Sequence, residues 1–336
     1  MSPRPVWHWI FQLGLGLGLQ AQPFQLPTAN RDIFQPGGET RYFVGTPGRS
    51  WASGTFGCVR SDGQQLHEGW DIRATGRDAR GEPTDEVRAT ADGVVAYVND
   101  RPALSNYGRF VILQHRVDGL EIYSIYAHLA RFRAGLKAGQ AVRAGEVLGI
   151  MGRTANTAQS IGKDRAHLHF ELGLRVSDRF SAWQRKHFPG QRNDHGEFNG
   201  RNFVSVDPLT IFREQQRQGA RFNLARVLQN QTLLCRVQVR ATRFAWLRRY
   251  PQLVAENPRA AREGTAGYEI WLNYHGLPYR LVPLAEGELK SRTRYHLLEV
   301  NAAEQQARPC GKLVARSGSG WRLTATGERW LDLLTE

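Results

Sequence analysis

The sequence predicts a mostly β fold, in which an antiparallel β-sheet domain is followed by an α+β accessory domain. Three observations lead to this prediction. The chain has 336 residues, which is enough for about two domains. Apolar and β-branched runs alternate with glycine-containing turns over residues 55–175. Beyond residue 222, strand-like runs mix with helical ones. Hydrophobic residues make up 41% of the chain, so both parts can bury a core.

The first domain is predicted to contain a series of short strands. Asp118-Gly119 separates two of the runs and is a strong signal for a tight hairpin. Strands of this length and spacing are typical of an antiparallel sheet or sandwich. The runs that predict strands are residues 93–98, 110–117, 120–129, 146–152 and 167–176.

Helical signals follow these strands. Residues 177–188 predict a helix within a polar excursion, and Asp207-Pro208 begins a helix that closes the first domain. A final amphipathic helix contains Trp330 and starts after Thr324 or Thr326 as cap. The predicted units are a signal peptide at 1–21, an extended lead-in at 22–54, the first domain at 55–215 and the accessory domain at 222–336. The sequence leaves the role of the accessory domain open.

The N-terminus has the pattern of a secretory signal peptide. Arg4 precedes an apolar run over residues 6–19, and a small-residue site ends at Ala21. A buried N-terminal helix is the alternative, but three glycines within the run disfavour a soluble helix. The run is also too short for a comfortable membrane span. We therefore expect cleavage after Ala21, a periplasmic or secreted protein, and no stable membrane insertion.

The formal net charge of +14 predicts attraction to polyanions such as nucleic acid, an anionic membrane or an anionic cell wall. Export argues against nucleic acid and favours a cell-wall polymer as partner. The sequence does not indicate an oligomeric state.

The three cysteines allow two readings. In an oxidising compartment Cys235 and Cys310 could pair within the C-terminal half, which would leave Cys58 free. Alternatively, all three are small buried hydrophobic residues. The sequence holds no C-x-x-C pair, so a cysteine zinc cluster is not indicated.

Two histidines stand one residue apart in the last strand of the first domain. In a strand, residues i and i+2 share a face, so His167 and His169 point one way while Leu168 and Phe170 point to the core. Zinc is the usual partner of neighbouring neutral imidazoles. On this pair alone, two surface histidines on an edge strand would be the simpler interpretation.

A second stretch, LHEGWDIRA, adds further candidate ligands. His67 and Asp71 share a face if the segment is extended, and Gly69 between them leaves room for a metal. Together with one histidine of the His167/His169 pair they make a set of two nitrogens and one oxygen. Catalytic zinc sites have three such protein ligands and keep the fourth position for water. His128 lies at the end of a predicted strand, and taken alone it would be an ordinary strand-end histidine.

Three motifs, taken in order, resemble one family. HEGWD at 67–71, YAHLA at 126–130 and AHLHFEL at 166–172 resemble the lysostaphin-type, or LytM-like, zinc metallopeptidases, which are peptidoglycan endopeptidases. The resemblance covers roughly residues 55–175. It implies a mostly antiparallel sheet with a groove across one face, and hydrolysis of peptide bonds in cell-wall cross-links or stem peptides.

The resemblance also implies residue roles. His67, Asp71 and His169 fall on the ligand positions for one zinc ion, and His128 and His167 on the two other histidines beside the metal. Zinc lowers the pKa of a bound water to roughly 7 and polarises the scissile carbonyl. One of the two free histidines can take the proton of that water and deliver it to the leaving amine. The other can hydrogen-bond the developing oxyanion.

Two carboxylates and an arginine lie close to the motifs. Strand alternation is expected to turn Glu68 and Glu171 away from the ligands, as structural residues or supports of the site. Arg60 could hydrogen-bond the substrate or a ligand carboxylate, and a plain surface salt bridge is the alternative. Trp70 and Tyr126 are expected in the core.

The other histidines receive no catalytic role. His115 is expected to pack within a strand, and His187 and His195 are expected to be solvated. His275 and His296 lie outside the resemblance.

Two rival functions compete with an exported zinc endopeptidase. The first is a catalytically silent regulator of the same fold, but such a protein is expected to lose ligands, and all five motif positions are present here. The second is a cell-wall-binding protein whose zinc is structural. A structural zinc site is normally closed by four protein ligands, whereas this sequence offers three and two free histidines.

Overall fold

The computed structural model of the protein describes residues 23–156 and 161–336. The expected signal peptide at 1–21 lies outside these described residues. Within them the strands are β1 Gly57–Arg60, β2 Gln65–His67, β3 Trp70–Arg73, β4 Glu86–Arg88, β5 Gly93–Asn99, β6 Phe110–Val117, β7 Leu120–Ala127, β8 Arg131–Phe132, β9 Ala141–Val142, β10 Val147–Ile150, β11 His167–Arg175, β12 Phe203–Val206, β13 Cys235–Val239, β14 Gly267–Leu272, β15 Pro278–Leu284, β16 Tyr295–Val300, β17 Val314–Ser317 and β18 Gly320–Leu323. The helices are α1 Glu39–Tyr42, α2 Phe180–His187, α3 Pro208–Gln218, α4 Leu224–Gln229, α5 Ala245–Arg249, α6 Pro258–Glu263, α7 Ala302–Ala307 and α8 Ala325–Thr335.

The mostly β, antiparallel fold predicted from the sequence is confirmed. A seven-stranded sheet has the order β12-β11-β7-β6-β5-β9, and β3 joins it by pairing with β11. Strands β6 and β7 are joined through Asp118-Gly119, and both residues have the positive φ that a tight hairpin turn of this kind requires. A smaller sheet, β4-β10-β8, lies beside the large one.

The faces of the large sheet differ in character. On β11, Leu168, Phe170 and Leu172 are buried in the main hydrophobic core, as strand alternation predicts. Trp70 and Tyr126 belong to the same core. The opposite face of β11 carries His167, His169 and Glu171, and a second, smaller hydrophobic cluster, which includes Phe110 and Ile125, lies on the same face of the sheet.

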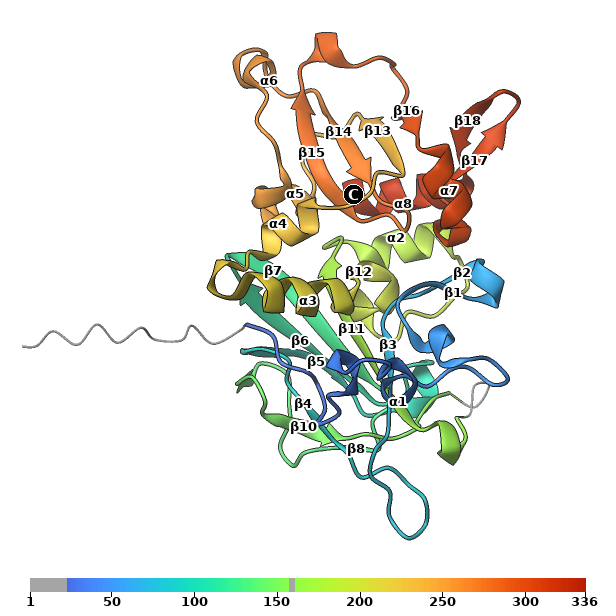
Figure 1. The fold of residues 1–336 in the computed structure, drawn as a ribbon. Coiled ribbons are helices and arrows are strands. Elements are labelled where there is room, and N and C mark those ends of the chain that lie inside the picture. The colour runs from blue at the N-terminus through green and yellow to red at the C-terminus, as the bar shows by residue number, and fades with distance from the viewer. Residues whose placement is uncertain (1–22, 157–160) are drawn as a thin grey trace, which may run out of the picture.

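Residues 222–336, which we call the C-terminal unit, form an α+β arrangement. A four-stranded antiparallel sheet, β15-β14-β13-β16, is accompanied by helices α4 to α8 and by the hairpin β17-β18. Thr324 caps α8, since its side chain accepts a hydrogen bond from the backbone N–H of Gly327. Figure 1 shows this unit stacked on one end of the large sheet, with α2 and α8 at the junction.

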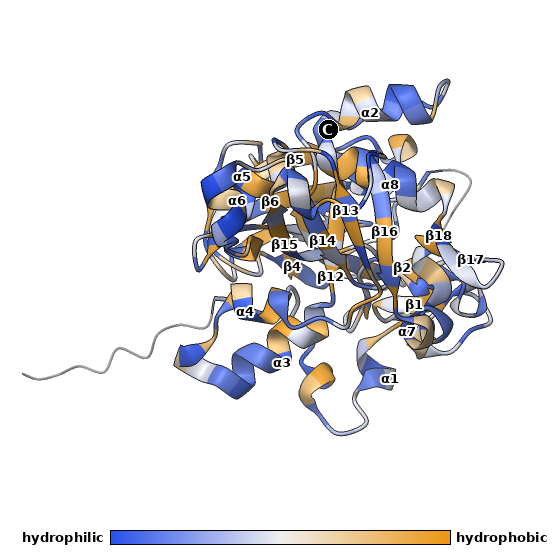
Figure 2. Cartoon of the chain, turned by 90° about the horizontal axis from the view of Figure 1, so that it is seen from above, coloured by the Kyte–Doolittle hydropathy of each residue, from blue (hydrophilic) through white to orange (hydrophobic). Residues whose placement is uncertain are grey.

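The larger of two hydrophobic clusters in the described residues is shared by both parts and includes residues from Phe24 to Leu334. Hydrophobic residues accordingly gather in the central strands, while α3 and α6 consist mainly of hydrophilic residues (Figure 2). The described part of the lead-in also contributes to this core, through Ile33, Tyr42 and Phe43. Every helix of the described residues is too short or too polar to span a bilayer.

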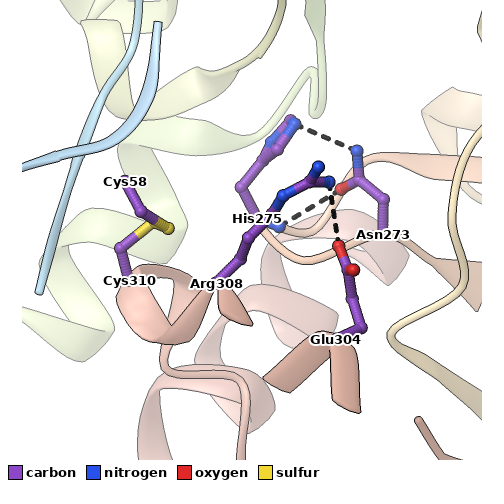
Figure 3. The surroundings of a disulfide bond; sticks show 6 residues. All are labelled: Cys58, Asn273, His275, Glu304, Arg308 and Cys310. Carbon is purple, nitrogen blue, oxygen red and sulfur yellow. Dashed lines mark hydrogen bonds and ion pairs between the residues drawn. A yellow bond between two sulfur atoms is a disulfide. The ribbon is translucent and has the colours of Figure 1, made fainter. Parts of the chain in front are cut away.

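Both readings of the three cysteines, a Cys235–Cys310 pair and three unpaired buried residues, are wrong. Cys58 in β1 forms a disulfide with Cys310, across a sequence separation of 252 residues, and Cys235 is the free, buried thiol (Figure 3). The pairing follows from the docking of the C-terminal unit, which brings the short 3-10 helix Pro309–Gly311 against β1 and β2. Distance along the sequence gives no information about this approach.

Candidate active site

The candidate ligands converge because β3 pairs with β11. The register places Asp71 directly opposite His169, and His67 ends β2 just before β3 begins. Asp71 Oδ1 lies 3.2 Å from His67 Nε2 and 3.0 Å from His169 Nδ1. The two imidazole nitrogens are 3.2 Å from each other, and all three residues are buried.

The protonation of the two imidazoles shows what this triangle can hold. His67 Nδ1 donates a hydrogen bond to the carbonyl oxygen of Thr55 at 2.7 Å, so its Nε2 carries a lone pair. In the neutral form of His169, Nε2 donates to Glu171 Oε1 at 2.8 Å, and Nδ1 then carries a lone pair as well. Two lone pairs and a carboxylate oxygen therefore face one another, which is unfavourable unless a cation lies between them.

The dimensions of the triangle fit a zinc ion. Ligand atoms about 2.1 Å from a tetrahedral zinc lie about 3.4 Å from one another, close to the three separations found here. The cluster also attracts positive charge. Burial lowers the pKa of His169, but hydrogen bonds with Asp71 and Glu171 outweigh burial and raise it to about 10. In the described part of the chain, the group that could hold a metal ion consists of His67, Asp71 and His169.

Arg60 supports the carboxylate of this group. Its guanidinium donates to Asp71 Oδ2, the oxygen that points away from the two imidazoles. Of the roles considered for Arg60, the hydrogen bond to a ligand carboxylate is the one that the structure shows. Burial raises the pKa of Asp71, yet the neighbouring His167 and His67 hold it well below its usual range. Asp71 is therefore an anion in the folded protein.

Two further histidines stand beside the candidate ligands. His128 follows β7 with a φ of +63°, and its Nδ1 donates to the carbonyl oxygen of Thr154 at 2.8 Å. His167 Nδ1 donates to the carbonyl oxygen of Arg165 at 2.7 Å. His128 thus keeps a free lone pair on Nε2, whereas His167 Nε2 lies 3.4 Å from Asp71 Oδ1, and the two ring centroids are 4.8 Å apart. Burial, followed by the charges of His167 and His169, lowers the pKa of His128 well below its usual value, so this ring is neutral.

Sequence comparison identifies this region. Residues 65–179 match the family described as Peptidase family M23. We call this part of the chain, which is similar to M23 peptidases, the M23 domain. The match contains all five motif residues, and it agrees with the resemblance to LytM-like peptidases drawn from the motifs.

Solved structures of three bacterial proteins are similar to parts of the chain. A zinc-containing peptidase from Vibrio cholerae shares 27% identity over 32% of this chain and 26% of its own length, with a TM-score of 0.24. The lysostaphin catalytic domain from Staphylococcus simulans shares 19% identity over 51% and 88%, with a TM-score of 0.30. Helicobacter pylori Csd3 shares 25% over 39% and 30%, with a TM-score of 0.26. The chain spans about a quarter of the length of the Vibrio cholerae peptidase. No curated protein matches the chain.

Glu171 corrects one expectation about the M23 domain. It was expected to face away from the ligands, but residues 167, 169 and 171 of a strand share one face. Its buried carboxylate accepts hydrogen bonds from His169 Nε2, from Tyr107 Oη and from Ser205 Oγ. Hydrogen bonds with His169 and Tyr107 outweigh burial and lower the pKa of Glu171. Glu171 thus fixes the orientation and the tautomer of His169.

Tyr107 is a residue of the site that the sequence did not indicate. Its ring stacks on the His169 imidazole with centroids 5.5 Å apart, and its hydroxyl reaches Glu171. The signal that could have found it is the loop before β6, which the motifs place next to the groove. Glu68, in contrast, lies at the groove rim and contributes no ligand atom to the metal-binding group.

The M23 domain opens into a groove of about 1100 Å³. His195 lines it, although it was expected to be solvated; the side chain is buried, bonds to Tyr97 Oη through Nδ1 and packs against Phe110. His275 and Trp330 of the C-terminal unit line the same groove. The groove wall therefore extends beyond the residues that match the family.

Two other histidines, His115 and His187, have structural roles. His115 is buried in β6 between the Asp92 carbonyl and Ser124 Oγ, as expected for packing. His187 is half-buried rather than solvated, because its Nε2 lies 3.0 Å from Asp332 Oδ2 on α8. Neither belongs to the metal-binding group.

Proposed function

We propose that the chain is an exported zinc-dependent endopeptidase that hydrolyses peptide bonds in the cross-links or stem peptides of peptidoglycan. The observation that carries this proposal is the convergence of two imidazole nitrogens and one carboxylate oxygen, with the Nε2 atoms of His128 and His167 beside them. The M23 match supports a metallopeptidase. The substrate follows from the lysostaphin-like character of the motifs.

In this proposal His67 Nε2, Asp71 Oδ1 and His169 Nδ1 hold one zinc ion. When bound there, zinc supplies a Lewis acid for the scissile carbonyl and lowers the pKa of a water molecule. His128 and His167 act on the substrate. One accepts the proton of the water at Nε2 and passes it to the leaving amine, while the other, which carries a proton taken from solvent on its Nε2, donates a hydrogen bond to the developing oxyanion and keeps that proton through the cycle.

The backbone contacts of these two histidines suit the role. The carbonyl oxygens of Thr154 and Arg165 hold Nδ1–H of His128 and His167, so the reactive nitrogen of each ring is Nε2. Neutral rings are needed for proton acceptance, and burial keeps His128 neutral. The positive φ of His128 turns the chain out of β7 at this point.

Export is part of the proposal and has two supports. The N-terminal residues have the pattern of a signal peptide, with Arg4, an apolar run and Ala21. The Cys58–Cys310 disulfide suits an oxidising compartment such as the periplasm or the exterior of the cell. The net charge of +14 favours an anionic wall as partner.

Digestion of purified sacculi tests the proposal. Released muropeptides are identified by mass spectrometry, which also reports the bond cleaved, and zinc content is measured on the same samples. His128→Ala is expected to keep zinc and to release no muropeptides. His296→Ala, a half-buried histidine on β16, serves as the matched control and is expected to behave like the wild type.

The rival functions give different results. A wild-type protein that binds zinc and cleaves no sacculus would support a silent regulator or a wall-binding protein instead. Equal activity in the wild type and His128→Ala would remove His128 from the mechanism.

A further inference from the structure

The segment of residues 55–58 connects the candidate metal centre with the C-terminal unit. On one side, the carbonyl oxygen of Thr55 accepts the hydrogen bond from His67 Nδ1 at 2.7 Å. Gly57 also pairs with His67 across the β1–β2 ladder. This carbonyl selects the tautomer that leaves His67 Nε2 free for a metal, and it fixes the ring orientation.

On its other side, the 55–58 segment touches the C-terminal unit at each of the next three residues. The Phe56 ring meets the His275 ring edge to face, with centroids 5.4 Å apart. Gly57 has a φ of +111°, and a Cβ at this position would lie 3.3 Å from Tyr274 Oη. Cys58 is covalently bound to Cys310 (Figure 3). Residues that orient His67 are therefore held by residues more than 200 positions further along the chain.

The surface that holds the 55–58 segment is itself well ordered by hydrogen bonds. Asn273 Oδ1 accepts from the backbone N–H groups of His275 and Leu277, at 3.2 and 2.9 Å. The Asn273 amide then donates to His275 Nε2 at 3.0 Å (Figure 3). Arg308 lies over the Tyr274 ring at 5.0 Å and pairs with Glu304. The loop between β14 and β15 is thus a fixed support.

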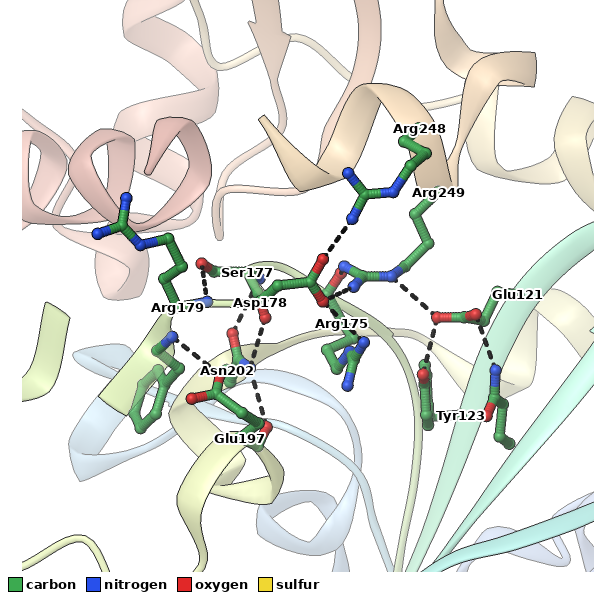
Figure 4. Close-up of polar contacts among 12 residues, drawn as sticks. Glu121, Tyr123, Arg175, Ser177, Asp178, Arg179, Glu197, Asn202, Arg248 and Arg249 are labelled. Atoms are coloured by element: carbon green, nitrogen blue, oxygen red, sulfur yellow. Dashed lines mark hydrogen bonds and ion pairs between the residues drawn. The ribbon is translucent and has the colours of Figure 1, made fainter. Parts of the chain in front are cut away.

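Independent contacts hold the C-terminal unit in place at the other end of the junction. Asp178 pairs with Arg248 and Arg249 of the C-terminal unit, and buried Arg249 also pairs with Glu121 at 3.0 Å (Figure 4). Nearby, Trp183 Nε1 donates to the carbonyl oxygen of Arg329 at 2.9 Å. These contacts fix the C-terminal unit relative to the large sheet independently of the 55–58 segment.

We propose that the C-terminal unit positions His67 for metal binding, through the 55–58 segment, with the Cys58–Cys310 disulfide as the covalent tie. The inference rests on the proposed function only in taking His67 as a ligand. Both partners of the tie lie outside residues 65–179, so the family match assigns them no role. Thr55 acts through its carbonyl as a positioning residue, and the C-terminal unit keeps that carbonyl at His67.

Loss of the tie should appear as weaker metal binding. Without the disulfide, β1 can move away from the C-terminal unit, and the Thr55 carbonyl then holds His67 in the right tautomer for less of the time. Loss of a hydrogen-bond partner of a metal-ligating histidine typically lowers metal affinity 10- to 100-fold.

The test compares zinc affinity, measured by chelator competition, in the wild type and in the double variant Cys58→Ser/Cys310→Ser. We expect zinc affinity to fall about 10-fold or more. Cys235→Ala, which removes the free buried thiol, is the matched control and should keep wild-type affinity. Saturating zinc should restore kcat in the double variant, and KM should stay unchanged, which a general loss of folding would not produce.

If the zinc affinities of the wild type and the double variant differ by less than about twofold, the inference is overturned. Such a difference is smaller than the typical effect of losing a hydrogen-bond partner of a metal-ligating histidine. If the double variant does not fold, Phe56→Leu keeps the disulfide and removes the ring contact with His275, and a smaller loss of zinc affinity is expected. An unchanged zinc affinity in Phe56→Leu would also overturn the inference. A wild type that binds zinc tightly but cleaves no sacculus overturns the proposed function and leaves this inference standing.

Discussion

Replacing Glu171 by Gln changes one charge in the contact that orients a candidate ligand. The Glu171 carboxylate is 1% exposed and accepts the hydrogen bond of His169 Nε2 at 2.8 Å. A glutamine of similar size keeps an oxygen for His169 but removes the charge. A hydrogen bond to a charged group contributes about 1.5–3 kcal/mol, against about 0.5–1.5 kcal/mol for a neutral one. The loss is therefore about 1–2 kcal/mol.

This loss appears in zinc binding, because the hydrogen bond to Glu171 raises the basicity of His169 Nδ1. A change of about 1–2 kcal/mol corresponds to a zinc affinity lowered roughly 5- to 30-fold. Chelator competition at pH 7 measures it directly. Glu269→Gln is the matched control, because Glu269 also lies on a strand and accepts a hydrogen bond from a ring, Trp271 Nε1, at 2.9 Å, but lies outside the metal-binding group. Wild-type zinc affinity in Glu171→Gln would refute the reasoning.

Three further predictions concern other parts of the molecule. Arg60→Met leaves the buried Asp71 Oδ2 without its donor, so urea melts in excess chelator should show the free energy of unfolding lowered by about 1–3 kcal/mol; an unchanged value contradicts this. Burial lowers the pKa of His115 from 6.5 to about 4, so the unfolded chain binds the additional proton and stability falls as the pH drops between these values. Between pH 7 and pH 5, urea melts should show a loss about 2 kcal/mol larger in the wild type than in His115→Gln, and equal losses would exclude this role. Trp330→Ala should raise KM for sacculus fragments several-fold and leave kcat unchanged, whereas Trp321→Ala, on the hairpin strand β18, should not; identical KM values would remove Trp330 from the groove wall.

Local patterns in the sequence were sufficient for the central strands of the large sheet, β5, β6, β7 and β11. The run at 110–117 became β6 with the same bounds, and Asp118-Gly119 became its hairpin turn. Period-2 alternation placed Leu168 and Phe170 in the core and His167 and His169 on the other face. These features depend on residues that are close together in the sequence, so the local pattern is enough to predict them.

The same period also predicts that Glu171 shares the face of His169, so this contact was available and was misjudged. Tyr107 was different, because its ring reaches His169 from a loop 62 positions earlier in the chain. The motifs place this loop next to the groove, but no local pattern reports which of its side chains reaches His169. His195 follows the same logic, since its burial depends on how the excursion after β11 folds back on Tyr97 and Phe110.

The contribution of the C-terminal unit could not be predicted from the sequence. Three cysteines allow three possible pairs, and the choice depends on a docking that spans 252 residues. The groove wall formed by His275 and Trp330 depends on the same docking. The hydrogen bond from His67 to the Thr55 carbonyl involves a backbone atom, which any residue type would supply.

Anomalous diffraction at the zinc edge, from crystals of the purified protein, tests the metal centre most directly. The expected result is one ion, about 2.0–2.2 Å from His67 Nε2, Asp71 Oδ1 and His169 Nδ1, with a fourth position that no protein atom fills. An ion bound elsewhere, or a fourth protein ligand that closes the site, would contradict a catalytic centre at these residues.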